Sequence, residues 1–202
     1  MFSKLAEFFK KSQSPEIVIV SGLPRSGTSM MMKMLEAGGI PPLTDAIRSA
    51  DADNPKGYYE FERVKQLPKG DFGWLPEAPG KAVKIIAALL PYLPPSYTYK
   101  VLFMRRAMPE ILASQRQMLV RRGEDPEKIS DDEIARLFEK HLSEVYRWMN
   151  ASEFVRYLDV DYNRMLAAPQ PLSEQIAAFL THPLDVQAMT GVVDPALYRQ
   201  RG

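Results

Sequence analysis

A short glycine-bounded segment, GLPRSGTS at residues 22–29, holds the residue types that bind phosphate or sulfate. It joins the β-branched run at residues 17–20 to a segment rich in Met and Leu. A turn between a buried strand and a helix directs backbone N–H groups and the positive helix end, about half a charge, at one point. Arg25 lies inside the turn, and its planar guanidinium matches phosphate oxygens. The segment therefore predicts an anion-binding site.

This segment differs at one position from the loop that binds nucleoside triphosphates, G-x-x-x-x-G-K-[ST]. Gly22 and Gly27 fit that pattern, but Thr28 stands where the lysine belongs. An ATP-dependent kinase of this fold class is therefore an alternative that lacks its usual cation. Asp159 or Asp161, near the end of a later predicted strand, would then supply the Mg²⁺ ligand.

A second candidate anion site follows the apolar segment at residues 99–104. Arg106 comes just after this predicted strand, and Ser114 stands eight residues later in a predicted helix. A guanidinium and a hydroxyl in these places can converge on a second phosphate. Arg105 is the alternative to Arg106 if the strand register differs by one residue.

Alternating strands and helices are expected to position these residues. Apolar runs predict strands at 17–20, 82–86, 99–104 and 154–160, and periodicity predicts helices at 29–37, 109–122, 130–149 and 172–180. Ser130 and Glu133 form a capping box before the third of these helices. We expect an α/β three-layer sandwich around a mostly parallel sheet, built as a single domain over residues 1–202. Residues 1–14 are expected to form a helical extension, and residues 41–80 form a long irregular segment of functional importance.

The composition excludes several classes of protein. The chain has 202 residues, 26 Lys and Arg against 25 Asp and Glu, a net charge of +1, two His and no Cys. Without cysteine there is no disulfide framework or thiolate chemistry, and the balanced charge disfavours a nucleic-acid surface. No apolar run approaches the roughly 20 residues of a membrane span, and the charged N-terminus is unlike a signal peptide. We expect a cytoplasmic protein, and the oligomeric state is left open.

The two anion motifs together resemble those of the sulfotransferase superfamily, whose members use 3′-phosphoadenosine 5′-phosphosulfate (PAPS). GLPRSGTS is similar to that family's 5′-phosphosulfate loop, with its P-[KR]-[ST]-G-T-[TS] core. The resemblance assigns Arg25 to the bridging oxygens of the phosphosulfate. It assigns the 5′-phosphate to backbone and hydroxyl donors of Ser26, Gly27, Thr28 and Ser29.

The resemblance extends to the 3′-phosphate and adenine sites. Arg106, Glu110 and Ser114 fill the family's R-x-x-x-[DE]-x-x-x-S pattern, which assigns Arg106 and Ser114 to the 3′-phosphate. The later segment YNRMLAAP is similar to Y-[ED]-x-L-x-x-P, which places Tyr162 near the adenine, although Asn163 replaces the usual acid. The expected fold is then the sulfotransferase fold, with PAPS as co-substrate and no metal.

The catalytic base is not the histidine that many family members use in a K-T-H segment. The matching stretch is Lys84-Ile85-Ile86, so Lys84 is retained as a catalytic cation and the histidine is absent. The chain's only histidines, His141 and His182, are assigned packing or surface roles. Heparan and protein-tyrosine sulfotransferases use a glutamate after the first helix, and this resemblance points to Glu60 as general base, with Glu62 as the alternative.

The predicted activity is transfer of a sulfuryl group from PAPS to a hydroxyl or amine of a small molecule or glycan. Residues 41–80 are expected to form the acceptor side of the site, with Tyr58, Tyr59, Phe72 and Trp74 as candidate walls. The absent histidine also permits a third hypothesis, a non-catalytic protein that binds phosphoadenosine compounds.

Overall fold

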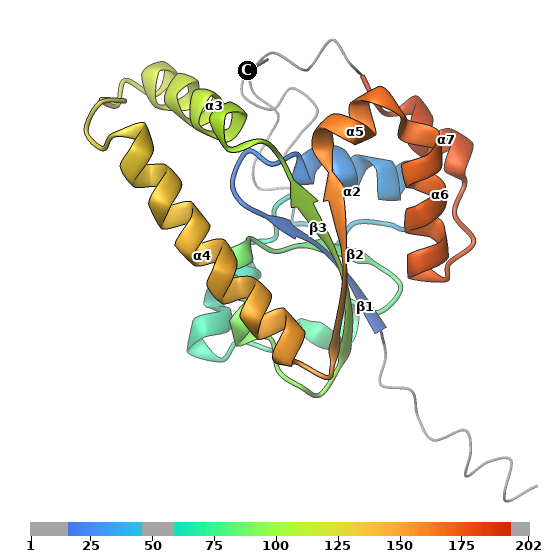
Figure 1. Ribbon diagram of the computed structural model, residues 1–202. Helices are drawn as coiled ribbons and strands as arrows, with labels where there is room; N and C mark the ends of the chain where they lie inside the picture. The colour runs from blue at the N-terminus through green and yellow to red at the C-terminus, as the bar shows by residue number, and fades with distance from the viewer. Residues whose placement is uncertain (1–15, 46–58, 195–202) are drawn as a thin grey trace, which may run out of the picture.

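The computed structural model of the chain describes residues 16–45 and 59–194, and Figure 1 shows how their helices and strands are arranged. The helical extension predicted for residues 1–14 lies outside the described residues, as does Tyr58.

A four-stranded parallel sheet forms the centre of the fold. Its strands are β1 (Glu16–Gly22), β2 (Ala82–Lys84), β3 (Thr98–Arg105) and β4 (Val155–Asp161), in the order β2-β1-β3-β4. All three pairings are parallel, which confirms the expected sheet. Pairing of Val20 with Lys84, Gly22 with Met104 and Arg105 with Asp161 brings the carboxyl ends of the strands to one edge. In open α/β sheets this edge is where ligands bind.

Helices cover both faces of the sheet, which confirms the three-layer arrangement (Figure 1). Alternate residues of β1 face opposite sides, with Ile17 and Ile19 in one core cluster and Val18 and Val20 in the other. The first cluster is covered by α4 (Asp131–Ala151) and by the 3₁₀ helices η1 (Glu62–Lys69), η2 (Leu75–Glu77) and η3 (Ala87–Tyr92). The second is covered by α2 (Thr28–Ala37), α5 (Tyr162–Ala167), α6 (Pro169–Leu180) and α7 (Val186–Gly191).

The helix α3 (Met108–Arg121) follows β3 and leans against the N-terminal half of α4, beyond the carboxyl edge of the sheet (Figure 1). Ser130 caps α4 by accepting a hydrogen bond from the Glu133 N–H at 3.3 Å, as the capping box predicts. Helical periodicity over residues 130–149 predicts that Leu137 lies on the buried side of α4, but this prediction is wrong, because the residue is 56% exposed. This half of α4 extends past the sheet, so only its C-terminal half, with Val145 and Met149, reaches the core.

The described part of the segment at residues 41–80 is more ordered than its composition suggests. Pro42 forms a parallel bridge to Ala82, so residues 41–45 run beside β2 toward the carboxyl edge. Trp74 is fully buried and packs edge-on against Phe61 at 5.5 Å between ring centroids. Trp74 therefore belongs to the core, whereas Phe72 is exposed. Among residues 16–45 and 59–194, no helix combines the length and apolarity that crossing a membrane requires.

Candidate functional site

Two glycines, Gly22 and Gly27, shape the loop between β1 and α2. Any other residue at either position would have a strained backbone and a steric clash. Gly22 has φ 149°, and a Cβ there would lie 2.5 Å from Ser26 Oγ and 2.7 Å from the Met104 carbonyl oxygen. Gly27 has φ 99°, and a Cβ there would lie 2.4 Å from the ring of Tyr162. The loop is therefore packed tightly between β3 and α5, as a preformed binding loop requires.

Gly27 is the N-cap residue of α2, in the left-handed conformation and with no side-chain cap among the described residues. The first N–H groups of a helix have no partner within the helix itself. Thr28 and Ser29 occupy this first turn, so their N–H groups point toward the loop at the positive end of α2. This arrangement has the geometry of an anion site.

Ser26 closes the loop from within. Its hydroxyl donates to the Leu23 carbonyl oxygen at 2.7 Å, and its N–H donates to the same oxygen at 3.2 Å. The side chain is buried, with 1% of the residue exposed. Both donors of Ser26 therefore hold the turn in this structure, which leaves the donors of Gly27, Thr28 and Ser29 as the better candidates for a phosphate.

Arg25 connects the loop to α3. Its Nε atom donates to Ser114 Oγ at 2.8 Å, across 89 positions of sequence. Its backbone has φ 69°, a left-handed conformation that is uncommon for a residue with a side chain. The carbonyl oxygen of Arg25 accepts a hydrogen bond from Arg106 Nη1 at 3.0 Å, which stabilises this conformation. The two anion motifs of the sequence thus meet at Arg25.

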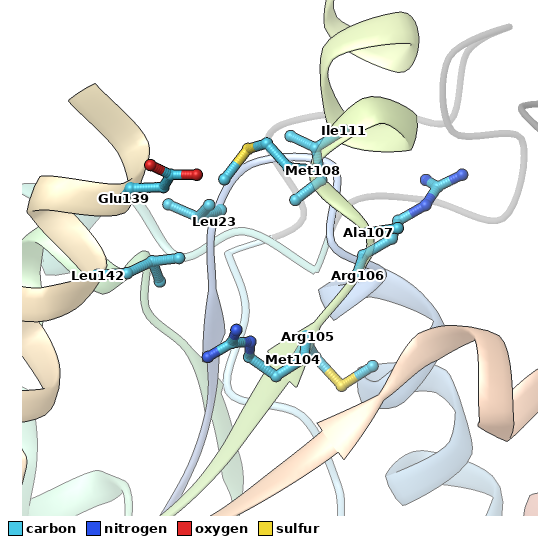
Figure 2. Close-up of a pocket in the computed structure, with 9 residues that line it drawn as sticks. All are labelled: Leu23, Met104, Arg105, Arg106, Ala107, Met108, Ile111, Glu139 and Leu142. Carbon is cyan, nitrogen blue, oxygen red and sulfur yellow. The ribbon is translucent and has the colours of Figure 1, made fainter. Parts of the chain in front are cut away.

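Arg106, and not Arg105, lies on the side of β3 that faces this loop. The Arg106 guanidinium bonds to Glu110 at 2.8 Å and lies 4.7 Å from the centre of the Tyr162 ring. Figure 2 shows the Arg105 side chain leaving the strand in the opposite direction, toward α4. There Arg105 Nη1 donates to the Tyr146 hydroxyl at 2.8 Å. The register therefore places Arg106 with Arg25 and Ser114.

Tyr162 is buried against Gly27 and Arg106 rather than projecting into open space. Only 8% of the residue is exposed. Burial raises the pKa of its hydroxyl, and the charge of Glu110 adds to this, although Arg106 and Arg25 act in the opposite direction. The ring is neutral at physiological pH and separates the loop glycine from the Arg106 guanidinium. Its assignment to the adenine stays a prediction.

Lys84 reaches the same loop from β2. Its Nζ atom donates to Ser29 Oγ at 3.3 Å, so a cation from the end of β2 lies at the first turn of α2. Lys84 is half-buried, as are Arg25 and Ser29. Arg25 in the loop, Ser29 at the start of α2 and Lys84 at the end of β2 all lie at the carboxyl edge of the sheet.

The backbone of Glu60 is fixed beside the end of the segment at residues 41–45. The Glu60 carbonyl oxygen accepts hydrogen bonds from Thr44 Oγ1 at 2.7 Å and from the Asp45 N–H at 3.4 Å. The Asp45 carboxylate in turn accepts from the Glu62 N–H at 2.6 Å. Since residues 41–45 run alongside β2, these bonds place Glu60 at the same edge of the sheet as Lys84.

Glu62, the alternative base, has a different environment. Its carboxylate pairs with Lys65 in the first turn of η1, at 2.6 and 2.8 Å, and 42% of its side chain is exposed. Tyr59, next to Glu60, has φ 53° and donates its hydroxyl to Glu36 on α2 at 2.6 Å. Glu60 and Glu62 are both half-buried, and the assignment of Glu60 as general base stays a prediction.

Two residues of the site had no assigned role in the sequence analysis, Glu110 and Asn163. Glu110 bonds to Arg106 through Oε2 at 2.8 Å and to Asn163 Nδ2 through Oε1 at 2.7 Å. Glu110 is buried, whereas a glutamate on an amphipathic helix is usually exposed. The sequence signal for Glu110 was its place in the R-x-x-x-[DE]-x-x-x-S pattern. The sequence signal for Asn163 was that it replaces the acid usual at its position in the family.

Asp159 and Asp161, the candidate Mg²⁺ ligands of the kinase alternative, both accept hydrogen bonds within the fold. Asp161 caps α5 by accepting from the Arg164 N–H at 2.8 Å, and Asp159 accepts from the Tyr146 hydroxyl at 2.5 Å. No group of three or more acidic or histidine side chains in the described ranges has the arrangement of a metal site. His141 lies on α4, and His182 is exposed after α6.

A cavity of about 280 Å³ opens on the α4 side of the loop. Figure 2 shows the start of α3 above it and α4 beside it. Its lining residues are mainly apolar, with three charged residues among them: Leu23, Met104, Ala107, Met108, Ile111, Leu142, Arg105, Arg106 and Glu139. The loop residue Leu23 is therefore shared between this cavity and the candidate anion site.

Comparison with known proteins agrees with the fold. No family model matches the chain, and no curated protein sequence matches it. Among solved structures, it is similar to a "Sulfotransferase Domain from the Curacin Biosynthetic Pathway", at 18% sequence identity and a TM-score of 0.56. The similarity covers 91% of this chain and 79% of that one. The chain therefore has the sulfotransferase fold, as the two motifs predicted.

Proposed function

We propose that this protein transfers a sulfuryl group from PAPS to a hydroxyl or amine of an acceptor. The observation that carries the proposal is the meeting of the two anion motifs at Arg25, whose side chain bonds to Ser114 and whose carbonyl bonds to Arg106. A nucleotide with phosphate groups at both its 5′ and 3′ positions is the ligand that two adjacent anion sites of this kind would hold. The sulfotransferase fold supports the same conclusion.

The chain's residues fit the two ends of such a nucleotide. The first turn of α2, with Thr28 and Ser29, would hold the 5′-phosphate through backbone donors, and Gly27 lets the loop pack against Tyr162. Ser26 would act by holding the turn. Arg106 and Ser114 would hold the 3′-phosphate. The Tyr162 ring would pack against the Arg106 guanidinium and border the adenine.

The chemistry requires a cation where the leaving oxygen develops charge and a base for the acceptor proton. Bound PAPS supplies an activated sulfuryl group, whose transfer is an in-line displacement. Arg25, in the loop before α2, and Lys84, beside the first turn of α2, are the cations that would stabilise the leaving phosphate. Glu60, held at the same edge by Thr44 and Asp45, would take the proton from the acceptor.

The acceptor we favour is a small molecule or glycan that enters from the side of η1 and α4. Phe61, the residue after Glu60, packs in the core cluster on that side, and the cavity next to Leu23 offers apolar walls for part of the acceptor. Arg105, Arg106 and Glu139 are its charged residues.

Thermal unfolding with added nucleotide tests the proposal. Adenosine 3′,5′-bisphosphate should raise the unfolding temperature, whereas ATP with Mg²⁺ should not do so comparably. A preference for ATP with Mg²⁺ would reject the proposal in favour of a kinase. The wild-type protein should also release adenosine 3′,5′-bisphosphate from PAPS in the presence of an acceptor mixture, with sulfate recovered on the acceptor.

Two substitutions make the assay specific. Lys84→Ala should reduce turnover by about 10²-fold, the size seen for loss of one positioned charge-stabilising donor, with a smaller effect on nucleotide binding. Arg105→Ala, on the far side of β3, should leave nucleotide binding intact. Nucleotide binding without any transfer, over a broad set of acceptors, would instead favour a non-catalytic phosphoadenosine-binding protein.

A further inference from the structure

The carboxylate of Glu110 lies between two partners and uses one oxygen for each. Arg106 Nε donates to Oε2 at 2.8 Å, and Asn163 Nδ2 donates to Oε1 at 2.7 Å. The Arg106 and Glu110 side chains are only 8% and 6% exposed. A buried carboxylate bonded in this way restricts the rotamers of both partners, because breaking either bond would leave a buried polar group unpaired.

The rest of the Arg106 guanidinium is restrained as well. Its Nη1 atom donates to the Arg25 carbonyl oxygen at 3.0 Å, and its carbon lies 4.7 Å from the centre of the Tyr162 ring. The contacts come from α3, from the loop after β1 and from α5. A planar guanidinium held from three directions has one orientation toward a ligand.

We propose that Glu110 and Asn163 are positioning residues, which fix Arg106 in the orientation that recognises the 3′-phosphate and so set the preference for a 3′-phosphorylated nucleotide. The proposal rests on the proposed function. It adds that this preference depends on an amide–carboxylate pair that does not itself contact the nucleotide.

In this structure the amide of Asn163 supplies a hydrogen-bond donor to Glu110, which an ionised carboxylate cannot supply. A carboxylate in its place would face Glu110 Oε1 at hydrogen-bond distance, and two ionised carboxylates so close repel each other. Relief of that repulsion would move Glu110, and Arg106 would move with it. The asparagine supplies a donor and no charge.

Substitutions of equal size separate positioning from charge. In Glu110→Gln, the side-chain oxygen can still accept from Arg106, and its NH₂ group can donate to Asn163 after the asparagine amide turns over. The geometry is kept and one negative charge is removed. In Asn163→Asp, the geometry is lost and one negative charge is added.

The experiment measures the affinities of adenosine 3′,5′-bisphosphate and adenosine 5′-phosphate by titration calorimetry, and their ratio defines the 3′-phosphate preference. Asn163→Asp should lower the preference by about tenfold, the size of one lost hydrogen bond to a charged group. Glu110→Gln should keep the preference or increase it. The matched control is Glu174→Gln on α6. Glu174 accepts a hydrogen bond from Gln170 at 2.8 Å in an exposed carboxylate–amide pair, so this substitution should leave the 3′-phosphate preference unchanged.

The outcomes that overturn the proposal are distinct. If Asn163→Asp lowers both affinities and the unfolding temperature but keeps the ratio, the pair is only structural and the proposal is wrong. The same holds if Glu174→Gln lowers the ratio as Asn163→Asp does. If the wild-type protein shows no preference for the bisphosphate, the proposed function fails and this proposal fails with it.

Discussion

Ser114 Oγ accepts the hydrogen bond from Arg25 Nε, so the hydroxyl hydrogen of Ser114 remains to be given to another acceptor. The contact links the loop that would hold the 5′ end of a nucleotide to the helix that would hold its 3′ end. Because a hydroxyl that accepts from a cation is a stronger donor, Ser114 is well suited to an anion. The position of Arg25 is therefore sensitive to what Ser114 binds.

Ser114→Ala should weaken binding of adenosine 3′,5′-bisphosphate by about tenfold, because one hydrogen bond to a charged ligand is lost. Binding of adenosine 5′-phosphate should change much less. Titration calorimetry measures both affinities. Ser143→Ala is the matched control, since Ser143 is an exposed serine of α4 that donates to the Glu139 carbonyl. Equal losses for both nucleotides would contradict the assignment of Ser114 to the 3′-phosphate.

Glu60→Gln should lower the rate of sulfuryl transfer by about 10²–10⁴-fold, the usual contribution of a general base, and leave nucleotide affinity unchanged. A coupled assay for adenosine 3′,5′-bisphosphate release measures the rate. Glu77→Gln, at an exposed position after Trp74, controls for loss of a surface carboxylate. If Glu62→Gln shows the loss and Glu60→Gln does not, the base is Glu62.

Gly27→Ala should destabilise the protein by more than Gly39→Ala does. Both glycines have φ near 100°, but a Cβ at Gly27 meets the Tyr162 ring at 2.4 Å, whereas nothing lies within 4 Å at Gly39. The left-handed backbone alone costs about 1–3 kcal/mol, and the steric clash adds about 1–3 kcal/mol at Gly27. Urea unfolding measures the difference. Equal losses at the two positions would mean that Tyr162 does not pack against the loop.

The free energy of unfolding should fall as pH rises above about 10, the ordinary tyrosine pKa. Burial raises the pKa of Tyr59, Tyr99, Tyr146 and Tyr162 above this value, and hydrogen bonds to Glu36 and Asp159 add to the effect at Tyr59 and Tyr146. Unfolded tyrosines then lose protons that the native ones keep, so high pH favours unfolding, and below pH 10 these groups add no slope.

Chemical unfolding from about pH 8 to about pH 11 measures this slope. Tyr99→Phe should make it shallower, because Tyr99 is almost fully buried. Tyr92→Phe, at an exposed position, is the matched control. A flat profile in the wild-type protein would contradict the expected protonation of the buried tyrosines.

The sequence was sufficient for the elements with a strong pattern. Runs of β-branched residues predicted β1 and β3, and the capping residues predicted the start of α4. The short helices α5 and α7 were missed, because six residues are too few for a helical period. Their signals are local: Asp161 and Asp185 each cap the following helix through a side-chain oxygen.

For the site, spacing alone identified the residue types but not their partners. Arg25 and Arg106 were predicted from motifs 81 positions apart, and the contact between them depends on the pairing of β1 with β3. Nothing in the local sequence indicated that Ser26 bonds to Leu23, or that Asn163 reaches Glu110 across 53 positions. The first contact depends on the exact backbone conformation of one loop and the second on packing between distant elements, and sequence patterns encode neither.

The left-handed backbone of Arg25 has a consequence for engineering. Arg25→Gly would relieve about 1–3 kcal/mol of conformational cost and lose about 1 kcal/mol with the bond to Ser114, so the two changes nearly cancel. A selection for heat resistance would accept this variant without penalty, although it removes the cation that we propose stabilises the leaving phosphate. Variants of this protein selected for thermal stability therefore need an activity assay as well, because a stability measurement does not detect the loss of the Arg25 side chain.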